Sequence, residues 1–96
     1  MIGAGLTKET RREIYRRDGW RCALCDSTDG LQIHHVVPRG EGGSDFPENL
    51  IALCWRCHAI AHGMRMPELW WTQDDVAQMC TEYVSDYYAG NWYPYK

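Results

Sequence analysis

The pattern of polar and apolar positions in the first half of the chain predicts a helix followed by a strand. Residues 8–17 are polar and charged around isolated apolar positions. Thr7 is suited to cap such a helix and Gly19 to end it. Residues 31–37 are rich in β-branched side chains and stop at Pro38, a pattern typical of a strand. The Gly- and Pro-rich stretch 38–49 then predicts an irregular loop.

The second half is predicted to be mainly helical. Residues 50–53 are apolar and suit either a second strand or the approach to a helix from about Cys54 to Gly63. Farther on, a helical stripe recurs at intervals of three and four residues, with Thr72 as its N-cap. Its members are Val76, Met79, Cys80, Tyr83, Val84 and Tyr87. The expected class is a small α+β fold.

The composition suits one small domain over residues 1–96 whose core needs reinforcement. The chain is 45% hydrophobic, but Trp, Tyr, Met and Cys make up much of that fraction. A core of this kind, in a chain this short, usually depends on a metal or disulfides. We interpret the C-terminal aromatic residues as core and capping, with base stacking or self-association as alternatives. They are Trp70, Trp71, Tyr83, Tyr87, Tyr88, Trp92, Tyr93 and Tyr95.

Charge is distributed unevenly along the chain. The net charge is −3, which by itself argues against nucleic-acid binding. However, residues 1–40 carry a net +2 and residues 41–96 a net −5. The basic residues of the first helix and the turn after it could face a polyanion, or could form a solvated, ion-paired helix face. They are Arg11, Arg12, Arg16, Arg17 and Arg21.

The chain has neither the pattern of a signal peptide nor an apolar run of the ~20 residues that a membrane span requires. A cytoplasmic protein without membrane contact is therefore expected. In a reducing compartment, regularly spaced cysteines are more often metal ligands or redox groups than disulfides.

Four of the five cysteines form two Cys-x-x-Cys pairs, Cys22 with Cys25 and Cys54 with Cys57. A two-residue spacer lets two thiolates converge on one ion, and two such pairs complete a tetrahedral structural zinc site. A redox pair is the alternative, although it would not explain the second copy. Cys80 is left over and is interpreted as a small buried hydrophobic residue.

The four histidines, His34, His35, His58 and His62, predict a second metal site. His58 and His62 are four residues apart on one helix, a spacing that places two imidazoles over one ion. At about 100° per residue, their mean direction differs by roughly 90° from that of the Cys54 and Cys57 pair. One helix can therefore contribute to two separate sites.

Together these residues resemble the HNH nuclease family, the ββα-metal nucleases, over residues 17–63. The order that carries the resemblance is Arg17-Asp18, Cys22-x-x-Cys25, His34-His35-x-x-Pro38-Arg39, Gly42-Gly43, Asn49-Leu50, Cys54-x-x-Cys57-His58 and His62. The resemblance implies a two-stranded hairpin with a long connecting loop, packed on a helix and holding one divalent ion. Flanking N- and C-terminal helices, the latter in an extension over 67–96, lie largely outside it.

The resemblance also implies roles for individual residues. His35 matches the general base of the family. Asn49 matches the residue that fixes the connecting loop and orients that base. His58 matches a metal ligand, His34 stands where many members have Asp, and His62 resembles an additional ligand found in colicin-type members.

The chemistry of phosphodiester hydrolysis requires groups of these kinds. Histidine can accept a proton from water near neutral pH, and a divalent ion can stabilise the leaving oxygen. Arg39 is a candidate phosphate clamp because guanidinium matches two phosphate oxygens, or else a solvated loop residue. Three imidazoles favour Zn²⁺, Ni²⁺, Co²⁺ or Mn²⁺ over Mg²⁺. Because neighbouring strand residues face opposite ways, His34 and His35 can reach one phosphate only at a twisted strand end.

The sequence thus predicts a metal-dependent endonuclease that nicks DNA with weak sequence specificity, as a monomer or weak dimer. The alternatives are a non-catalytic zinc-dependent module that binds nucleic acid, and an RNase or toxin-type nuclease.

Overall fold

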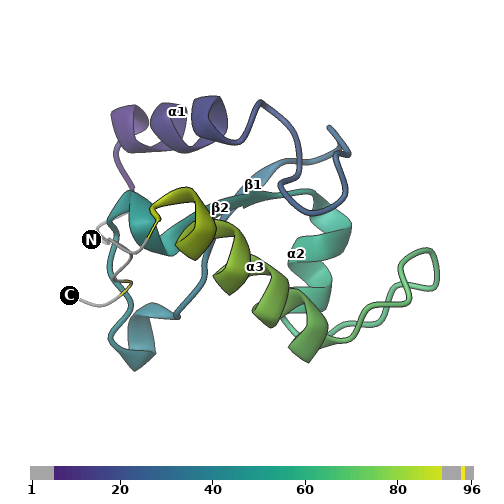
Figure 1. Cartoon of the computed structure of the whole chain (residues 1–96). Coiled ribbons are helices and arrows are strands. Elements are labelled where there is room, and N and C mark those ends of the chain that lie inside the picture. The colour runs from purple at the N-terminus through teal and green to yellow at the C-terminus, as the bar shows by residue number, and fades with distance from the viewer. Residues whose placement is uncertain (1–5, 90–93, 95–96) are drawn as a thin grey trace.

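The computed structural model describes residues 6–89 and residue 94 (Figure 1). Two short strands form an antiparallel hairpin, which lies between helix α1 on one side and helices α2 and α3 on the other. The order α1–β1–β2–α2–α3 confirms the small α+β fold, with a ββα core and flanking helices. Trp92, Tyr93 and Tyr95, which were assigned to the core or its cap, lie outside the described residues.

The hairpin consists of β1 (Gln32–His35) and β2 (Leu50–Leu53), paired so that His35 lies opposite Leu50 and Gln32 opposite Leu53. The observed β1 is shorter than the predicted 31–37, because four-residue β2 offers a partner only to these four positions. The connecting loop contains two single 3-10 turns, at Arg39–Glu41 and Pro47–Asn49. The loop joins the end of β1 to the start of β2, so His34 and His35 lie at the loop end of the hairpin.

The two faces of the hairpin pack into separate cores. Ile51 and Leu53 pack with the apolar residues of α2 (Trp55–Ala61) and α3 (Gln73–Tyr87). Leu50 and Ala52 pack instead against Ile14 of α1 (Lys8–Arg17). Because residues paired across two strands point to the same face, His34, opposite Ile51, belongs to the α2 face. His35, opposite Leu50, belongs to the α1 face.

The helix ends match the capping signals. The Thr7 hydroxyl accepts a hydrogen bond from the Thr10 amide at the start of α1. At the start of α3, Thr72 and Asp75 form a reciprocal capping box in which each side chain accepts from the other's backbone amide. These bonds satisfy amides that have no partner inside the helix. The predicted starts of both helices are confirmed to the residue.

The apolar stripe of α3 is buried through its first three turns. Val76, Cys80 and Val84 are inaccessible to solvent or nearly so, and Tyr83 packs at their margin. The last member of the predicted stripe, Tyr87, is 57% exposed and lies beside the Arg17 guanidinium instead of in the core. Cys80 is a buried, uncharged thiol whose burial raises its pKa to about 12, as expected for a residue that serves only packing.

Arg17 is a structural residue, which corrects its assignment to a nucleic-acid surface. Its side chain is only 4% exposed and forms a two-pronged ion pair with the buried Asp18. The same guanidinium donates to the carbonyl oxygens of Pro47 and Leu50. Asp18 in turn accepts from the Ala52 amide and the Tyr83 hydroxyl. The pair therefore joins α1, the loop, β2 and α3.

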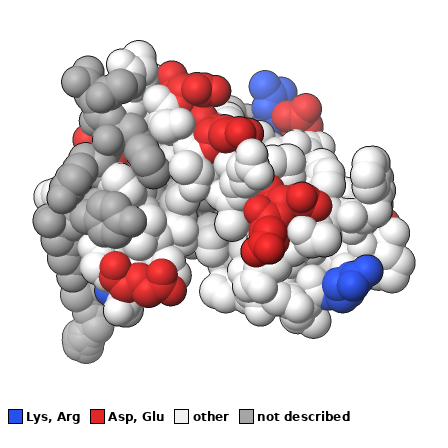
Figure 2. Space-filling view, turned by 60° about the horizontal axis from the view of Figure 1, so that its bottom comes forward, with Lys and Arg blue, Asp and Glu red and all other residues white. Residues whose placement is uncertain are grey.

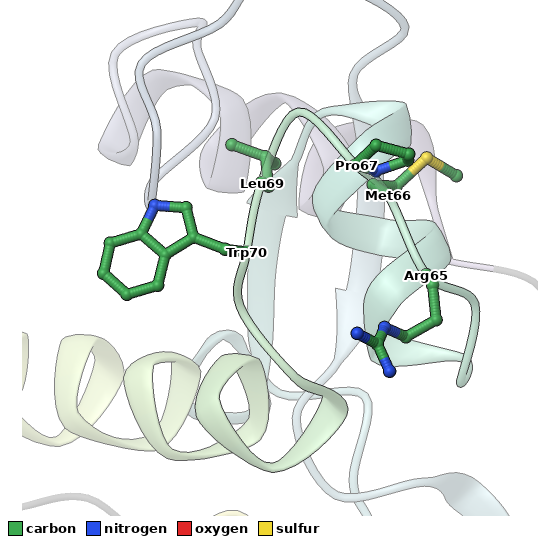
Figure 3. Close-up of a pocket in the computed structure, with 5 residues that line it drawn as sticks. All are labelled: Arg65, Met66, Pro67, Leu69 and Trp70. Carbon is green, nitrogen blue, oxygen red and sulfur yellow. The ribbon is translucent and has the colours of Figure 1, made fainter.

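Trp70, which was expected in the core or its cap, lies at the surface. It is 89% exposed, whereas its neighbour Trp71 packs against the main core. Figure 3 shows Trp70 on the arm of the 63–72 loop that returns toward α3, with its ring outside the loop. A single bridge between Met66 and Leu69 closes the tip of this loop. Alternation between neighbouring residues along an extended arm explains why one indole is covered and the other is not.

Within the described part of the chain, no helix has the length and apolar character needed to cross a membrane.

Candidate metal and catalytic site

Four cysteine sulfurs converge between the turn after α1 and the start of α2. The cluster comprises Cys22, Cys25, Cys54 and Cys57, whose Sγ atoms all lie within 4.8 Å of one another. Cys25 and Cys54 approach to 3.5 Å between sulfurs, far longer than a disulfide, and all four are free thiols. Tetrahedral zinc with bonds of about 2.3 Å places its sulfur ligands about 3.8 Å apart. The residues therefore fit a structural zinc ion.

The electrostatics of this cluster also favour a cation. A hydrogen bond from Cys57 lowers the pKa of Cys22 to about 5. The same contact, together with burial and the neighbouring sulfur charges, raises the pKa of Cys57 far above that of a free thiol. One thiolate forms readily, whereas further thiolates repel it unless positive charge is added. A bound dication supplies that charge, and zinc ligation requires deprotonated thiols.

Three imidazoles converge at a second place, formed by the end of β1 and the outer face of α2. His34, His58 and His62 bring ring nitrogens within 4.8 Å of one another. The Nε2 atoms of His58 and His62 are 3.0 Å apart. Two nitrogen ligands of a tetrahedral zinc lie about 3.3 Å apart, for bonds of about 2.0 Å. This cluster fits one transition-metal ion, and α2 contributes to both clusters as its spacing predicted.

The surroundings hold these imidazoles in the form that binds metal. Burial, followed by the neighbouring histidines, lowers the pKa of His34 to about 4. Burial also lowers the pKa of His58, and His62 adds to the effect. The side chain of His58 contacts Gln32 through its Nδ1, which donates to the amide oxygen and leaves Nε2 free toward His62. Neutral imidazoles with one nitrogen so oriented are typical metal ligands.

His35 reaches the same place from the other face of the strand. A hollow of about 260 Å³ at the end of the hairpin is lined by all four histidines together with Pro38 and Arg39. β1 ends at His35, and the His35 side chain lines the hollow beside the other three histidines. His34 and His35 therefore lie at a strand end, the position that two neighbouring strand residues need in order to reach one phosphate.

Asn49 holds the loop rather than the imidazole. Its side-chain oxygen accepts from the Val37 amide at 2.7 Å, and its amide group donates to the carbonyl oxygens of Val37 and Ser44, both at 2.9 Å. Both amide hydrogens are therefore used on the backbone and neither is left for a hydrogen bond to His35, the base that Asn49 was expected to orient. The side chain is fully buried, so it joins the two ends of the loop from within.

Asp45 is the residue that contacts His35. Its Oδ1 lies 2.8 Å from His35 Nε2 and 2.9 Å from Arg39 Nε. The hydrogen bond from His35, and then the Arg39 guanidinium, lower the pKa of the Asp45 carboxyl. Sequence reasoning did not find Asp45, because the loop also contains Glu41 and Glu48 and no spacing rule separates the three. Its role is visible only once the loop is folded.

The exposed basic residues lie mainly along α1. On α1 they are Lys8, Arg11, Arg12 and Arg16, which lie among the exposed Glu9 and Glu13. Arg39, Arg65 and Arg21, the last of which is 3.5 Å from Asp26, are exposed elsewhere. The face of the molecule in Figure 2 differs, because carboxylates are scattered over it and basic side chains lie toward its rim. Positive charge is therefore gathered on the α1 side, the side of the hairpin to which His35 belongs.

Comparison with known proteins finds similarity over the residues that form these clusters. Residues 22–63 match the model of the HNH endonuclease family. A type IV methyl-directed restriction enzyme of Escherichia coli strain K12 is 44% identical over 39 residues, 41% of this chain and 14% of its own length. A probable mobile endonuclease C of enterobacteria phage T4 is 37% identical over 49 residues, 44% of this chain and 23% of its own.

A third relative has a different name. Anaredoxin of Nostoc sp. strain PCC 7120 is 27% identical over 56 residues, which cover 57% of this chain and 74% of its own. The chain thus spans less than a quarter of the two endonuclease relatives. The matched stretch of the family model contains both metal-binding clusters, His35 and the whole connecting loop. Residues 22–63 of this chain are thus similar to the HNH endonuclease family.

Proposed function

We propose that this chain is a metal-dependent endonuclease that hydrolyses DNA phosphodiester bonds and nicks one strand per event. The observation that carries the proposal is the hollow at the end of the hairpin, where a cluster of three imidazoles meets a fourth histidine and an arginine. A metal-binding group, a base and a phosphate-binding group are what hydrolysis of a phosphodiester requires.

Each group has a separate task. A divalent ion held by His34, His58 and His62 would polarise a phosphoryl oxygen and stabilise the departing 3′ oxygen. His35 accepts a proton from the attacking water as the new phosphorus–oxygen bond forms and the bond to the 3′ oxygen breaks. The leaving oxygen then takes a proton from solvent. Arg39 binds a non-bridging oxygen through the nitrogens that Asp45 does not occupy.

The identity of the ions follows from the ligand atoms. Four thiolates select zinc for the cysteine cluster. Three imidazoles suit Zn²⁺, Ni²⁺, Co²⁺ or Mn²⁺ better than Mg²⁺, which prefers oxygen. The two sites are therefore separable by chelation and by substitution.

DNA with weak sequence specificity is the proposed partner. Arg11, Arg12, Arg16 and Arg21 are exposed and can neutralise backbone phosphates, which carry no sequence information. One active site per chain cuts one strand per encounter, so a monomer or weak dimer yields nicks. Double-strand breaks require a second encounter.

Three other functions remain as alternatives. A module that only binds nucleic acid has no use for His35 beside the three ligand histidines. An RNase would share the same hollow, so RNA belongs among the substrates tested. A redox function, which the name of the Nostoc relative suggests, would use thiol pairs but not the histidine cluster.

The deciding experiment is cleavage of supercoiled plasmid with a panel of divalent metals. Wild type is expected to produce open-circular DNA before linear DNA, and excess EDTA should stop the reaction. His35→Ala should abolish nicking while metal content and far-ultraviolet circular dichroism stay unchanged. His58→Ala should also be inactive but should bind one metal ion fewer.

The binding module and the RNase each give a different result from a DNA nickase. A binding module shifts DNA in gels without cutting it, and an RNase cleaves single-stranded RNA but leaves the plasmid intact. Retained activity in His35→Ala contradicts the assigned base. Direct conversion of plasmid to linear form at low enzyme contradicts single-strand nicking.

A further inference from the structure

We propose that Asp45 is a positioning residue that fixes His35 with its proton on Nε2, so that Nδ1 is the nitrogen that accepts a proton from water. This inference rests on the proposed function, because it concerns the same base. It assigns a role to a residue that sequence motifs do not single out, and it specifies which ring nitrogen acts.

The contact itself has the geometry of a charge-assisted hydrogen bond. His35 Nε2 and Asp45 Oδ1 are 2.8 Å apart, within the usual range for a ring nitrogen and a carboxylate. The side chain of His35 is 20% exposed and that of Asp45 is 43% exposed. The more exposed Asp45 carboxylate therefore occupies the Nε2 position of the ring as a hydrogen-bond partner.

The charge state of Asp45 determines the direction of the bond. The carboxyl has its pKa lowered by His35 and Arg39, so it is ionised at neutral pH. An ionised carboxylate can only accept hydrogen bonds. His35 must donate through Nε2, and a neutral imidazole that carries its proton there has a bare lone pair on Nδ1.

The backbone around Asp45 is held on both sides, so the carboxylate is placed before substrate arrives. The preceding Ser44 is buried, its amide donates to the Pro94 carbonyl, and its own carbonyl accepts from Asn49. The following Phe46 amide donates to the Ser44 hydroxyl. Asn49 thus influences the base indirectly, through Ser44 and Asp45, instead of through a contact with the ring.

Arg39 shares the same carboxylate oxygen. The bond from Arg39 uses Nε, which leaves both terminal guanidinium nitrogens available to a phosphate. Asp45 therefore links the base to the phosphate-binding arginine at a fixed separation. Loss of the Asp45 carboxylate should make the positions of both His35 and Arg39 less fixed. Only the change at His35 can be followed through the tautomer of its ring.

The first test uses long-range proton–nitrogen correlation spectra of the zinc-loaded full chain. At about pH 8.5, above the usual titration range of histidine, imidazole tautomers are resolved. The resonance that disappears in His35→Ala belongs to His35 and should show the Nε2–H form. In Asp45→Ala it should shift toward a mixture of tautomers, while Glu41→Ala, an exposed carboxylate in the same loop, leaves it unchanged.

The second test is plasmid nicking by the same variants. Asp45→Ala should lower kcat by about 10- to 100-fold, the loss typical of a removed orienting partner. Asp45→Asn, whose amide oxygen can still accept from Nε2, should recover part of the loss. Metal content and the unfolding temperature should match wild type in both variants.

The outcomes separate this inference from the proposed function. Wild-type His35 in the Nδ1–H form, or a spectrum unchanged in Asp45→Ala, overturns the role of Asp45 whatever the activity. Equal kcat values for Asp45→Ala and wild type do the same. A wild-type protein that fails to nick overturns the proposed function, while the spectra still decide whether Asp45 fixes the ring.

Discussion

At the scale of single residues, the connecting loop depends on close contacts that leave no room for change. Asn49 is buried with three hydrogen bonds to the loop backbone. Gly43 packs against the Val37 carbonyl so closely that a Cβ at this position would lie 1.8 Å from that oxygen. The shape of the loop that carries Asp45 therefore depends on the Asn49 side chain and on the absence of a side chain at Gly43.

Gly43→Ala should therefore destabilise the protein, and Gly40→Ala should not. Overpacking of this kind costs about 1–3 kcal/mol in the free energy of unfolding. A Cβ at Gly40 meets nothing within 4 Å and should change stability by less than about 0.5 kcal/mol. Denaturant unfolding of both zinc-loaded variants tests the difference. Equal stability would show that the loop relaxes around the new methyl group.

At the scale of elements, two helices carry the organisation of the site. α2 and its two cap residues direct Cys54 and Cys57 to one cluster and His58 and His62 to another, so the two candidate metal sites share one rigid element. α1 is held to the hairpin by the ion pair of Arg17 and Asp18, which is almost fully shielded from solvent. A side chain that resembled part of a basic surface is in fact a cross-link between elements.

Arg17→Met should be strongly destabilising, because it leaves the buried Asp18 without a cation. Removal of one member of a buried pair costs about 3–5 kcal/mol. Arg16→Met, one position earlier and exposed, is the matched control and should cost less than about 0.5 kcal/mol. Thermal unfolding with metal present measures both. Should the two variants unfold together, the pair contributes little and α1 is held mainly by other contacts, such as those of Ile14 and Tyr15.

At the scale of the whole molecule, small apolar cores are combined with two metal clusters. The main core includes the cysteines Cys22, Cys54 and Cys57 themselves. The histidine cluster, in contrast, lies at the surface end of the hairpin and adds little to packing. The net charge of −3 conceals the basic α1 side, so whole-chain charge is the wrong scale for judging nucleic-acid binding.

Loss of the cysteine-bound metal should therefore affect folding, whereas loss of the histidine-bound metal should not. Cys57→Ser should abolish zinc-dependent folding, since binding energy at a structural site is folding energy. His58→Ala should keep native circular dichroism and lose only the second ion. Metal analysis together with circular dichroism distinguishes these results. A folded Cys57→Ser protein would assign the cysteines a role other than structural.

Much of the fold was predictable because its signals are local. Thr7 and Thr72 marked helix starts, and the strand pair and the helix carrying both clusters followed from short apolar runs and their stops. The pairs Cys22 and Cys25, Cys54 and Cys57, and His58 and His62 were predictable for the same reason, since two-residue and four-residue spacings place ligands on one turn or one helix face, whereas His34 was added through the family resemblance. The burial of Arg17, the exposure of Trp70 and the partner of His35 had no comparable signal.

The sequence by itself determined which elements form, which short spacings suit metal ligands, and the resemblance of residues 17–63 to the HNH nucleases. Those properties depend on residue type and on spacing within short segments of the chain. Only the tertiary structure decided that Asp45 contacts His35, that Asn49 holds the loop backbone, and that Arg17 is a cross-link. These contacts join residues separated along the chain, and their formation depends on how the loop and helices pack around the hairpin.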